Sequence, residues 1–173
     1  AKPTGPPGNL RKPPVSPLNE AEIAFLKKFA ETRRMDRENG PYFVDGSGDF
    51  GQGSDPDIRD HNHPPAGQPG LWCQWVPTGI GGKWAAPEDS AAARGGALVW
   101  NGTEKFYYGA EWMKYLVTHF LMPDAEASKS DDPQFAEFTF DHVLNGTIEA
   151  QGEESEILSL VEPVASAVTG SLR

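Results

Sequence analysis

All five tryptophans of this 173-residue chain fall between positions 72 and 112. Large aromatic side chains bury more surface than other residues, so this stretch is expected to form the centre of the folded body or a surface that grips a partner. We predict that Trp72, Trp100 and Trp112 pack in the core. For Trp84 and Tyr108 the pattern leaves core packing and surface contact equally open, and exposed aromatics beside glycine suit a sugar, a pigment or a proline-rich peptide.

Composition limits the size of that core. The chain contains 19 glycines and 16 prolines, which predicts long irregular segments, and its length suits one domain with appendages. It has no run of about 18 apolar residues, so no transmembrane helix is expected. Cys73 is the single cysteine, which excludes an internal disulfide, and we predict that its thiol is buried and inert.

The first 17 residues are expected to form an extended arm, because their six prolines and two glycines favour polyproline II and cannot build a core. Residues 1–37 carry a formal charge of +4 and the rest of the chain −14. The acidic body should repel nucleic acid, whereas the basic arm suits an acidic protein surface. We predict that other protein subunits bind through the arm and the loops, at Lys2, Arg11, Lys12, Pro13, Pro14, Trp84 and Tyr108.

The pattern after the arm predicts an α+β fold, with a small, mostly antiparallel sheet and two helices. We assign residues 1–18 to the arm, 19–162 to a single domain and 163–173 to a C-terminal tail. The first helix is expected over 19–39, with Asn19 as N-cap and Glu22 completing a capping box. The second helix is expected over 109–122. The basic residues of the first helix are expected to face solvent: Lys27, Lys28, Arg34 and Arg37.

The remaining elements are short strands and one long loop. Residues 45–70, rich in Gly, Asp and Pro, predict a loop. A hairpin over 135–151, turning at Asn145-Gly146, would place His142 opposite Glu149, as an acid–base pair or a structural one. Strands are expected over 42–44, 71–76, 97–100 and 157–161.

A His-x-His sequence is the strongest candidate for metal chemistry. Asp60, His61 and His63 carry nitrogen and oxygen donors of the kind that bind zinc or iron, and a third imidazole would have to come from His119 or His142. The alternative is a polar loop whose histidines cap backbone groups. No nucleophile elbow and no phosphate-binding loop occurs in the sequence.

Several motifs, in order, resemble a family of small uncharacterised proteins of cyanobacteria and algae. They are Gly67-Gln-Pro-Gly-Leu71-Trp-Cys-Gln-Trp-Val-Pro77, then Trp100, Glu104-Lys-Phe-Tyr107, Glu111-Trp112 through Tyr115-Leu116, Leu144-Asn-Gly146 and Gln151-Gly-Glu153. The resemblance covers roughly residues 40–153 and brings no known activity, hence no catalytic residue. It implies a plastid location after removal of a transit peptide. The Ala/Gly-rich stretch 77–96 and the proline-rich arm depart from the family pattern.

Three functional hypotheses follow. The first is a non-enzymatic accessory or scaffold subunit, without a cofactor, that binds neighbouring proteins in a larger assembly. In a plastid, that assembly would be a membrane complex such as a photosystem, touched from the aqueous side. The alternative is a small ligand-binding or metal-dependent enzyme domain that uses His61, His63 and an aromatic pocket around Trp84 and Tyr108. A carbohydrate-binding module is a third option.

Overall fold

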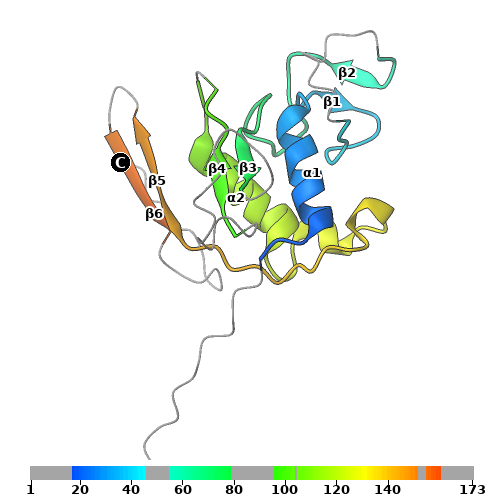
Figure 1. The fold of residues 1–173 in the computed structure, drawn as a ribbon. Helices are drawn as coiled ribbons and strands as arrows, with labels where there is room; N and C mark the ends of the chain where they lie inside the picture. The colour runs from blue at the N-terminus through cyan, green and yellow to red at the C-terminus, as the bar shows by residue number, and fades with distance from the viewer. Residues whose placement is uncertain (1–16, 46–54, 79–95, 104, 152–154, 161–173) are drawn as a thin grey trace, which may run out of the picture.

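The computed structural model describes residues 17–45, 55–78, 96–103, 105–151 and 155–160, and confirms the α+β class (Figure 1). Two helices, α1 (Glu20–Glu31) and α2 (Gly109–Leu116), lie side by side. The described strands form three separate antiparallel pairs instead of one sheet. These pairs are β1 (Asp36–Arg37) with β2 (Ile58–Asp60), β3 (Trp75–Pro77) with β4 (Leu98–Trp100), and β5 (Gly146–Gln151) with β6 (Ser155–Leu160).

Helix α1 begins as predicted and ends earlier than predicted. Asn19 is the N-cap, and its side chain and that of Glu22 form both hydrogen bonds of the capping box. The helix stops at Glu31, because the Thr32 backbone leaves the helical region. After Thr32 the backbone bonds to a different segment, because the Arg34 amide donates to the Leu71 carbonyl at 2.8 Å. The prediction of a helix to residue 39 is therefore wrong.

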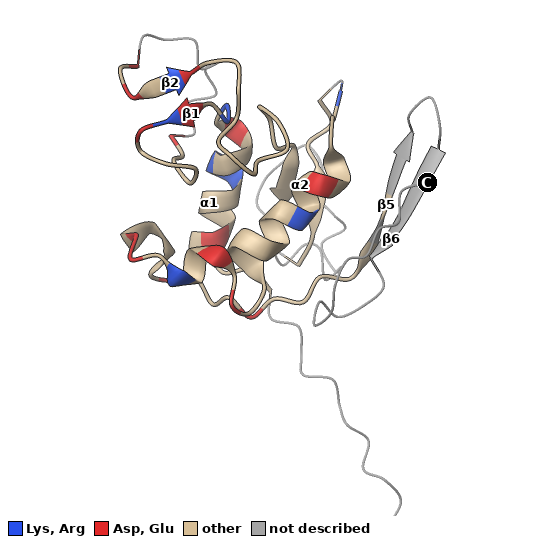
Figure 2. Ribbon diagram, turned by 180° about the vertical axis from the view of Figure 1, so that it is seen from behind, with Lys and Arg blue, Asp and Glu red and all other residues tan. Residues whose placement is uncertain are grey.

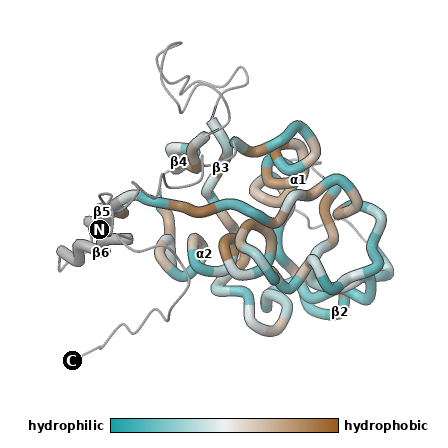
Figure 3. The backbone as a smooth tube through the Cα atoms, turned by 90° about the horizontal axis from the view of Figure 1, so that it is seen from below, coloured by the Kyte–Doolittle hydropathy of each residue, from teal (hydrophilic) through white to brown (hydrophobic). Residues whose placement is uncertain are grey.

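An aromatic core joins the two helices. The Phe25 ring lies 4.9 Å from that of Phe120, and the Phe29 ring lies 6.0 Å from that of Trp112, both edge-on. Edge-on pairs at these separations are favourable beyond the area that they bury. Figure 3 shows hydrophobic segments gathered around α1 and α2, with a hydrophilic stretch at β2. Trp112 is fully buried, as predicted, and anchors α2 in this core.

The second helix has the predicted extent with an unexpected last turn. After Leu116 the chain continues as a π-helix, Val117–Leu121, and the Met122 amide donates to the Val117 carbonyl at 3.0 Å. Such wider turns are rare and often occur at functional positions. This one carries His119, whose ring stacks on that of Tyr115 at 3.9 Å between centroids.

The segment after the second helix differs most from expectation. It contains two short 3-10 helices, Glu126–Lys129 and Pro133–Phe135, and then crosses beside the start of α1 without forming a strand. The predicted hairpin over 135–151 is wrong, because Gly146 begins β5, whose partner is the later strand β6. The His142 amide donates to the Leu121 carbonyl at 3.0 Å, which holds the crossing segment against the core.

Smaller corrections concern the strands. Residues 42–44 form no strand, the strand expected at 71–76 begins only at Trp75, and the loop predicted at 45–70 contains β2. Residues 1–16 of the arm, Trp84 and the tail 163–173 lie outside the described residues, whereas Leu18, assigned to the arm, packs against the core. Among the residues that are described, no helix is long and apolar enough to cross a membrane.

Candidate functional site

The predicted metal residues lie at the end of β2, which carries Asp60, and on the exposed loop that follows it, which carries His61 and His63. His63 Nδ1 and Asp60 Oδ2 are 2.8 Å apart, and the side chain of His61 is also exposed. Hydrogen bonds from the Asn62 amide and the His63 ring lower the pKa of the Asp60 carboxyl. Within the described ranges, no group of three or more His, Cys, Asp or Glu side chains is arranged to hold a metal ion. His119 and His142 lie in other parts of the structure, each with its own partners.

His142 pairs with Glu22 instead of with Glu149. His142 Nε2 lies 2.9 Å from Glu22 Oε2, and the two side chains are 4% and 0% exposed. The other oxygen of Glu22 accepts from the amide and the hydroxyl of Thr139, at 2.8 and 3.0 Å. Burial by itself raises the pKa of Glu22, but hydrogen bonds from His142, Thr139 and Asn19 outweigh it and lower this pKa to about 2. Glu22 is thus a buried, fully paired carboxylate.

The Glu22–His142–Thr139 cluster resembles a catalytic triad only in its residue types. A triad needs the nucleophile and the orienting carboxylate on opposite ring nitrogens of the histidine. Here the Thr139 hydroxyl and the Glu22 carboxylate both lie at Nε2 of His142, at 3.1 and 2.9 Å. The ionised Glu22 carboxylate can only accept, so Nε2 of His142 carries the shared proton and has no lone pair left to take a proton from the Thr139 hydroxyl. The arrangement therefore stabilises the fold and does not activate a nucleophile.

Arg34 is a second buried charge, and its predicted exposure to solvent is wrong. Its guanidinium is 2% exposed and lies over the Phe29 ring at 4.1 Å. It donates to Gln68 Oε1 at 3.2 Å and to the carbonyls of Phe43 and Pro41 at 2.7 and 2.8 Å. Burial lowers the pKa of Arg34 to about 10, so it stays charged at neutral pH. Arg37, also expected at the surface, is 5% exposed.

Tyr42 and His119 form a half-buried pair that was not predicted from the sequence. Tyr42 Oη lies 2.7 Å from His119 Nδ1. Burial lowers the pKa of His119 and raises that of Tyr42, so both are neutral near pH 7. The neutral ring then accepts from the tyrosine hydroxyl and carries its own proton on Nε2. The pair depends on the π-helical turn that carries His119, and no sequence pattern predicts such a turn.

Exposed aromatic side chains form the strongest candidate for a binding surface. Trp100, Tyr107 and Tyr108 are 44%, 66% and 58% exposed, and we call these three residues the aromatic surface. Trp100 was predicted in the core, and this prediction is wrong. Of the cross-strand partners Trp75 and Trp100, Trp75 on β3 packs against the core, whereas Trp100 on β4 lies beyond it. Tyr108 is placed at the surface by the structure, whereas its sequence pattern left both outcomes open.

Side-chain hydrogen bonds link the parts of the aromatic surface. Gln74 accepts from Trp100 Nε1 at 2.8 Å and donates to the Lys105 carbonyl at 2.6 Å, so it ties β4 to the turn before α2. Trp75 Nε1 donates to the Gly109 carbonyl at 2.7 Å, and its ring packs edge-on against Phe106. The exposed rings are therefore carried by a frame that is anchored in the fold.

Tyr108 sits at the start of α2 in an unusual conformation. Its φ is 59° and its ψ 38°, in the left-handed region, which costs a residue with a side chain on the order of 1–2 kcal/mol. A Cβ built on Gly70 would lie 3.6 Å from Tyr108 Cδ2 and 3.8 Å from Trp112 Nε1, so the Tyr108 ring lies over Gly70. Trp112 Nε1 is buried and has no hydrogen-bond partner in the described part of the chain.

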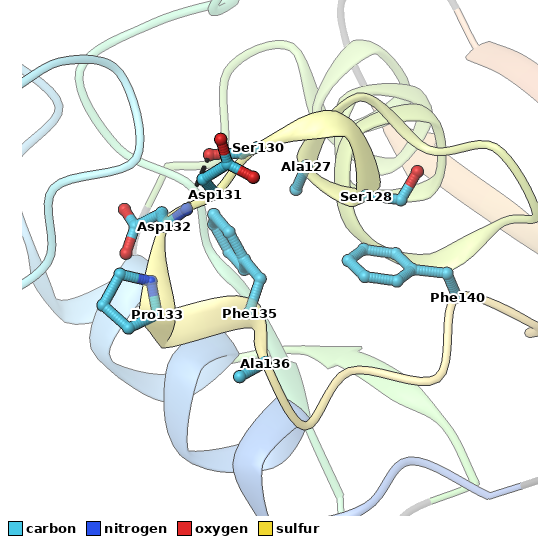
Figure 4. A pocket seen from close by; sticks show the side chains of 9 residues that line it. All are labelled: Ala127, Ser128, Ser130, Asp131, Asp132, Pro133, Phe135, Ala136 and Phe140. Carbon is cyan, nitrogen blue, oxygen red and sulfur yellow. Dashed lines mark hydrogen bonds between the residues drawn. The ribbon is translucent and has the colours of Figure 1, made fainter.

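A shallow hollow of about 240 Å³ lies between the two 3-10 helices and Phe140 (Figure 4). Three of its four polar side chains, those of Ser128, Ser130 and Asp132, are engaged within the loop itself. The Ser128 hydroxyl donates to the Ala125 carbonyl, and both oxygens of Asp132 accept from Gln134. Ser130 Oγ accepts from the Asp132 amide. No set of free polar groups converges on the space, and we assign it no ligand.

Cys73 is buried with no exposed surface, and burial raises the pKa of its thiol to about 12. Because only the thiolate attacks thiol reagents, we expect no modification of the folded chain at pH 8 within hours, and one equivalent within minutes in denaturant. Absorbance with a chromogenic disulfide reagent measures both. Rapid modification of the folded chain would contradict the buried position.

The chain matches no model of a protein family, no curated protein and no solved structure.

Proposed function

We propose that this chain is a non-enzymatic accessory subunit that binds neighbouring proteins through the aromatic surface. The observation that carries the proposal is the exposure of Trp100, Tyr107 and Tyr108 on an anchored frame. Tryptophan and tyrosine are the residues that most often dominate protein interfaces, because they bury a large area with few rotatable bonds. A frame that is already rigid also lowers the entropy lost on binding.

The ionisable groups inside the fold support the same reading. Glu22, His142 and Arg34 hydrogen-bond to the protein's own backbone and side chains, and each is nearly or fully buried. Their strong interactions stabilise the packing of α1 against the loops around it. Figure 2 shows Lys and Arg alternating with Asp and Glu along α1, α2 and the β1–β2 pair. Binding through aromatic area fits such a surface.

For the partner, we propose other subunits of a larger assembly, reached by the arm as well as by the aromatic surface. Lys2, Arg11 and Lys12 give the arm its positive charge, and Pro13 and Pro14 follow Lys12 directly in the sequence. The motif resemblance to proteins of cyanobacteria and algae supports a peripheral position on a photosynthetic membrane complex in a plastid. The alternative, a metal-dependent or ligand-binding domain, rests on the exposed contact between His63 and Asp60.

The test is native co-purification with a double variant, Trp100→Ala with Tyr107→Ala. The source organism would express this variant, the wild type or Arg59→Ala, whose side chain is 57% exposed on β2. Mild isolation and mass spectrometry would identify co-migrating chains. We expect the amount of co-purifying chains to fall at least tenfold in the double variant. Removing an aromatic side chain that dominates an interface costs about 2 kcal/mol or more, which is roughly 30-fold in affinity. Arg59→Ala should retain them.

Stability measurements separate lost binding from lost folding. Tyr107 is largely exposed, whereas Trp100 is 44% exposed and donates one hydrogen bond to Gln74, so we expect the double variant to lose no more than about 2 kcal/mol of unfolding free energy. Unchanged partners in the double variant would overturn the aromatic surface as the binding site. A free 18.8 kDa particle holding stoichiometric zinc or iron, lost in His61→Ala with His63→Ala, would favour the metal-dependent alternative.

A further inference from the structure

We propose that the outer edge of β4 is an interface between two copies of this chain, which pair their β4 strands antiparallel about a two-fold axis at Val99. The inference rests on the proposed function in one respect, because it names a second copy as the chain that covers Trp100. Three observations carry it: the free hydrogen-bonding edge of β4, the near symmetry of the sequence around Val99, and the exposure of Trp100.

The direction of the backbone hydrogen bonds leaves one side of β4 free. Ala97 and Asn101 bond to the β3 segment, the first through its carbonyl and the second through its amide, both at 2.9 Å. Because successive residues of an antiparallel strand point their amides and carbonyls to opposite sides, Leu98 and Trp100 direct theirs away from β3. In the part of the chain that the structure describes, β4 pairs with β3 alone. The outer edge of β4 therefore offers donors and acceptors to another strand.

The opposite edge of this pair is closed. Pro77 on β3 has no amide to donate on that side. Helix α1 packs against β3, and Figures 1 and 3 show β3 between β4 and α1. Proteins commonly protect a free edge with charged side chains, proline or a bulge. Residues 96–102 contain no charged residue and no proline, and the β3–β4 register is unbroken, so the β4 edge lacks all three protections.

The sequence of β4 suits pairing with itself. It is nearly symmetric about its centre and reads Gly96-Ala-Leu-Val99-Trp-Asn-Gly102. A two-fold axis at Val99 places each Leu98 opposite the Trp100 of the second copy, and the residues of each such pair exchange both of their backbone hydrogen bonds. Glycine meets glycine at both ends. No like charges oppose each other across the seam, although each copy carries a net charge of −10.

This pairing also gives Trp100 a second neighbour. Within one chain it lies opposite Trp75 and remains 44% exposed. Opposed residues of an antiparallel pair share a face of the sheet, so Leu98 of the second copy would lie on the other side of the Trp100 ring. An apolar row would then run across the joined sheet, from Trp75 through Trp100 to Leu98 and Pro77 of the second copy. The tryptophan that sequence placed in a core would be buried between two chains.

The test is the average mass of the purified full chain, measured by sedimentation velocity. Between about 5 and 500 µM, a range that suits a small interface, we expect the mass to rise from 18.8 kDa towards twice this value. Val99→Lys and Val99→Glu each set two like charges directly opposite at the axis, where Cα atoms lie about 4.5 Å apart. We expect each variant to raise the dissociation constant about tenfold or more. An equimolar mixture should recover the wild-type mass, because an ammonium then faces a carboxylate.

Val76→Lys is the matched control. Val76 lies opposite Val99 within the chain, so the change disturbs the same cross-strand contact. Its two ammonium groups would be three strand spacings apart in the dimer, roughly 14 Å, which exceeds the screening length of about 8 Å. It should dimerise within about twofold of wild type, since their repulsion is largely screened.

Two results would overturn the proposal. One is a wild-type mass that stays at 18.8 kDa over the whole range, which would leave the β4 edge to a strand of another protein. The other is a wild-type dimer that both Val99 variants still form, because the contact would then lie elsewhere. Native co-purification detects chains other than this one, so it tests the proposed function separately. A dimer without other partners would contradict that function and leave this inference standing.

Discussion

Replacing Glu22 with leucine should lower the free energy of unfolding by about 3–5 kcal/mol, the range for breaking a buried charged pair. Leucine keeps most of the volume and removes every acceptor. The amides of Asn19 and Thr139 and the ring of His142 would then each lose their hydrogen bond to this carboxylate. Urea denaturation followed by circular dichroism measures the change. Glu20→Leu, exposed in the same helical turn, is the matched control and should cost less than about 1 kcal/mol.

The same carboxylate makes a directional prediction about pH. The unfolded chain binds this proton near pH 4.5, whereas the folded chain binds it only near pH 2. The stabilisation by Glu22 is therefore complete above pH 4.5 and is lost as the pH falls from there towards 2. Because Glu22→Gln has no proton to bind, its deficit relative to wild type should shrink over this range. A deficit independent of pH between 6 and 3 would show that Glu22 has an ordinary pKa.

Replacing Arg34 with methionine should cost about 3–4 kcal/mol, since it leaves the Phe43 carbonyl and part of the Gln68 amide without a buried partner. Arg34→Lys should also be destabilising, by about 2 kcal/mol, because one ammonium cannot match the three directions in which the guanidinium donates. Both are measured by urea denaturation. Arg59→Met, at an exposed position, should stay within about 0.5 kcal/mol of wild type.

An Arg34→Met variant as stable as wild type would contradict this account. It would mean that the apolar ring of Phe29 and the methionine side chain pack well enough to replace the network. A urea dependence with an altered slope would instead indicate a change in the compactness of the folded or unfolded chain. The midpoint and the slope should therefore be reported together.

Local signals were predictable from sequence. The N-cap Asn19 and its partner Glu22 are three residues apart, and the capping box that they form is confirmed. The end of the second helix before Pro123 follows from a rule of the same kind. Such features depend on neighbours within one turn of helix, which a single sequence displays directly.

Long-range features were not predictable. Helical spacing placed Arg34 on a polar face, but its real neighbours, Pro41, Phe43 and Gln68, are brought to it by the loops that follow α1. Glu22 looked like a capping residue only, and its second role requires His142, 120 residues later. The Asn145-Gly146 pair predicted a turn at the wrong place, because local propensity carries no information on which strand supplies the partner.

The Glu22 contacts also have a consequence for how the chain is made. The amide of Thr139 that this carboxylate accepts from is 117 residues further along the chain. At ribosomal rates of 5–20 residues per second, roughly 6 to 23 s pass between the synthesis of α1 and that of its partner. Throughout that interval the nascent helix must keep its acidic first turn in water. The first turn of α1 is therefore synthesised early but completes its hydrogen bonds only after Thr139 has been added to the chain.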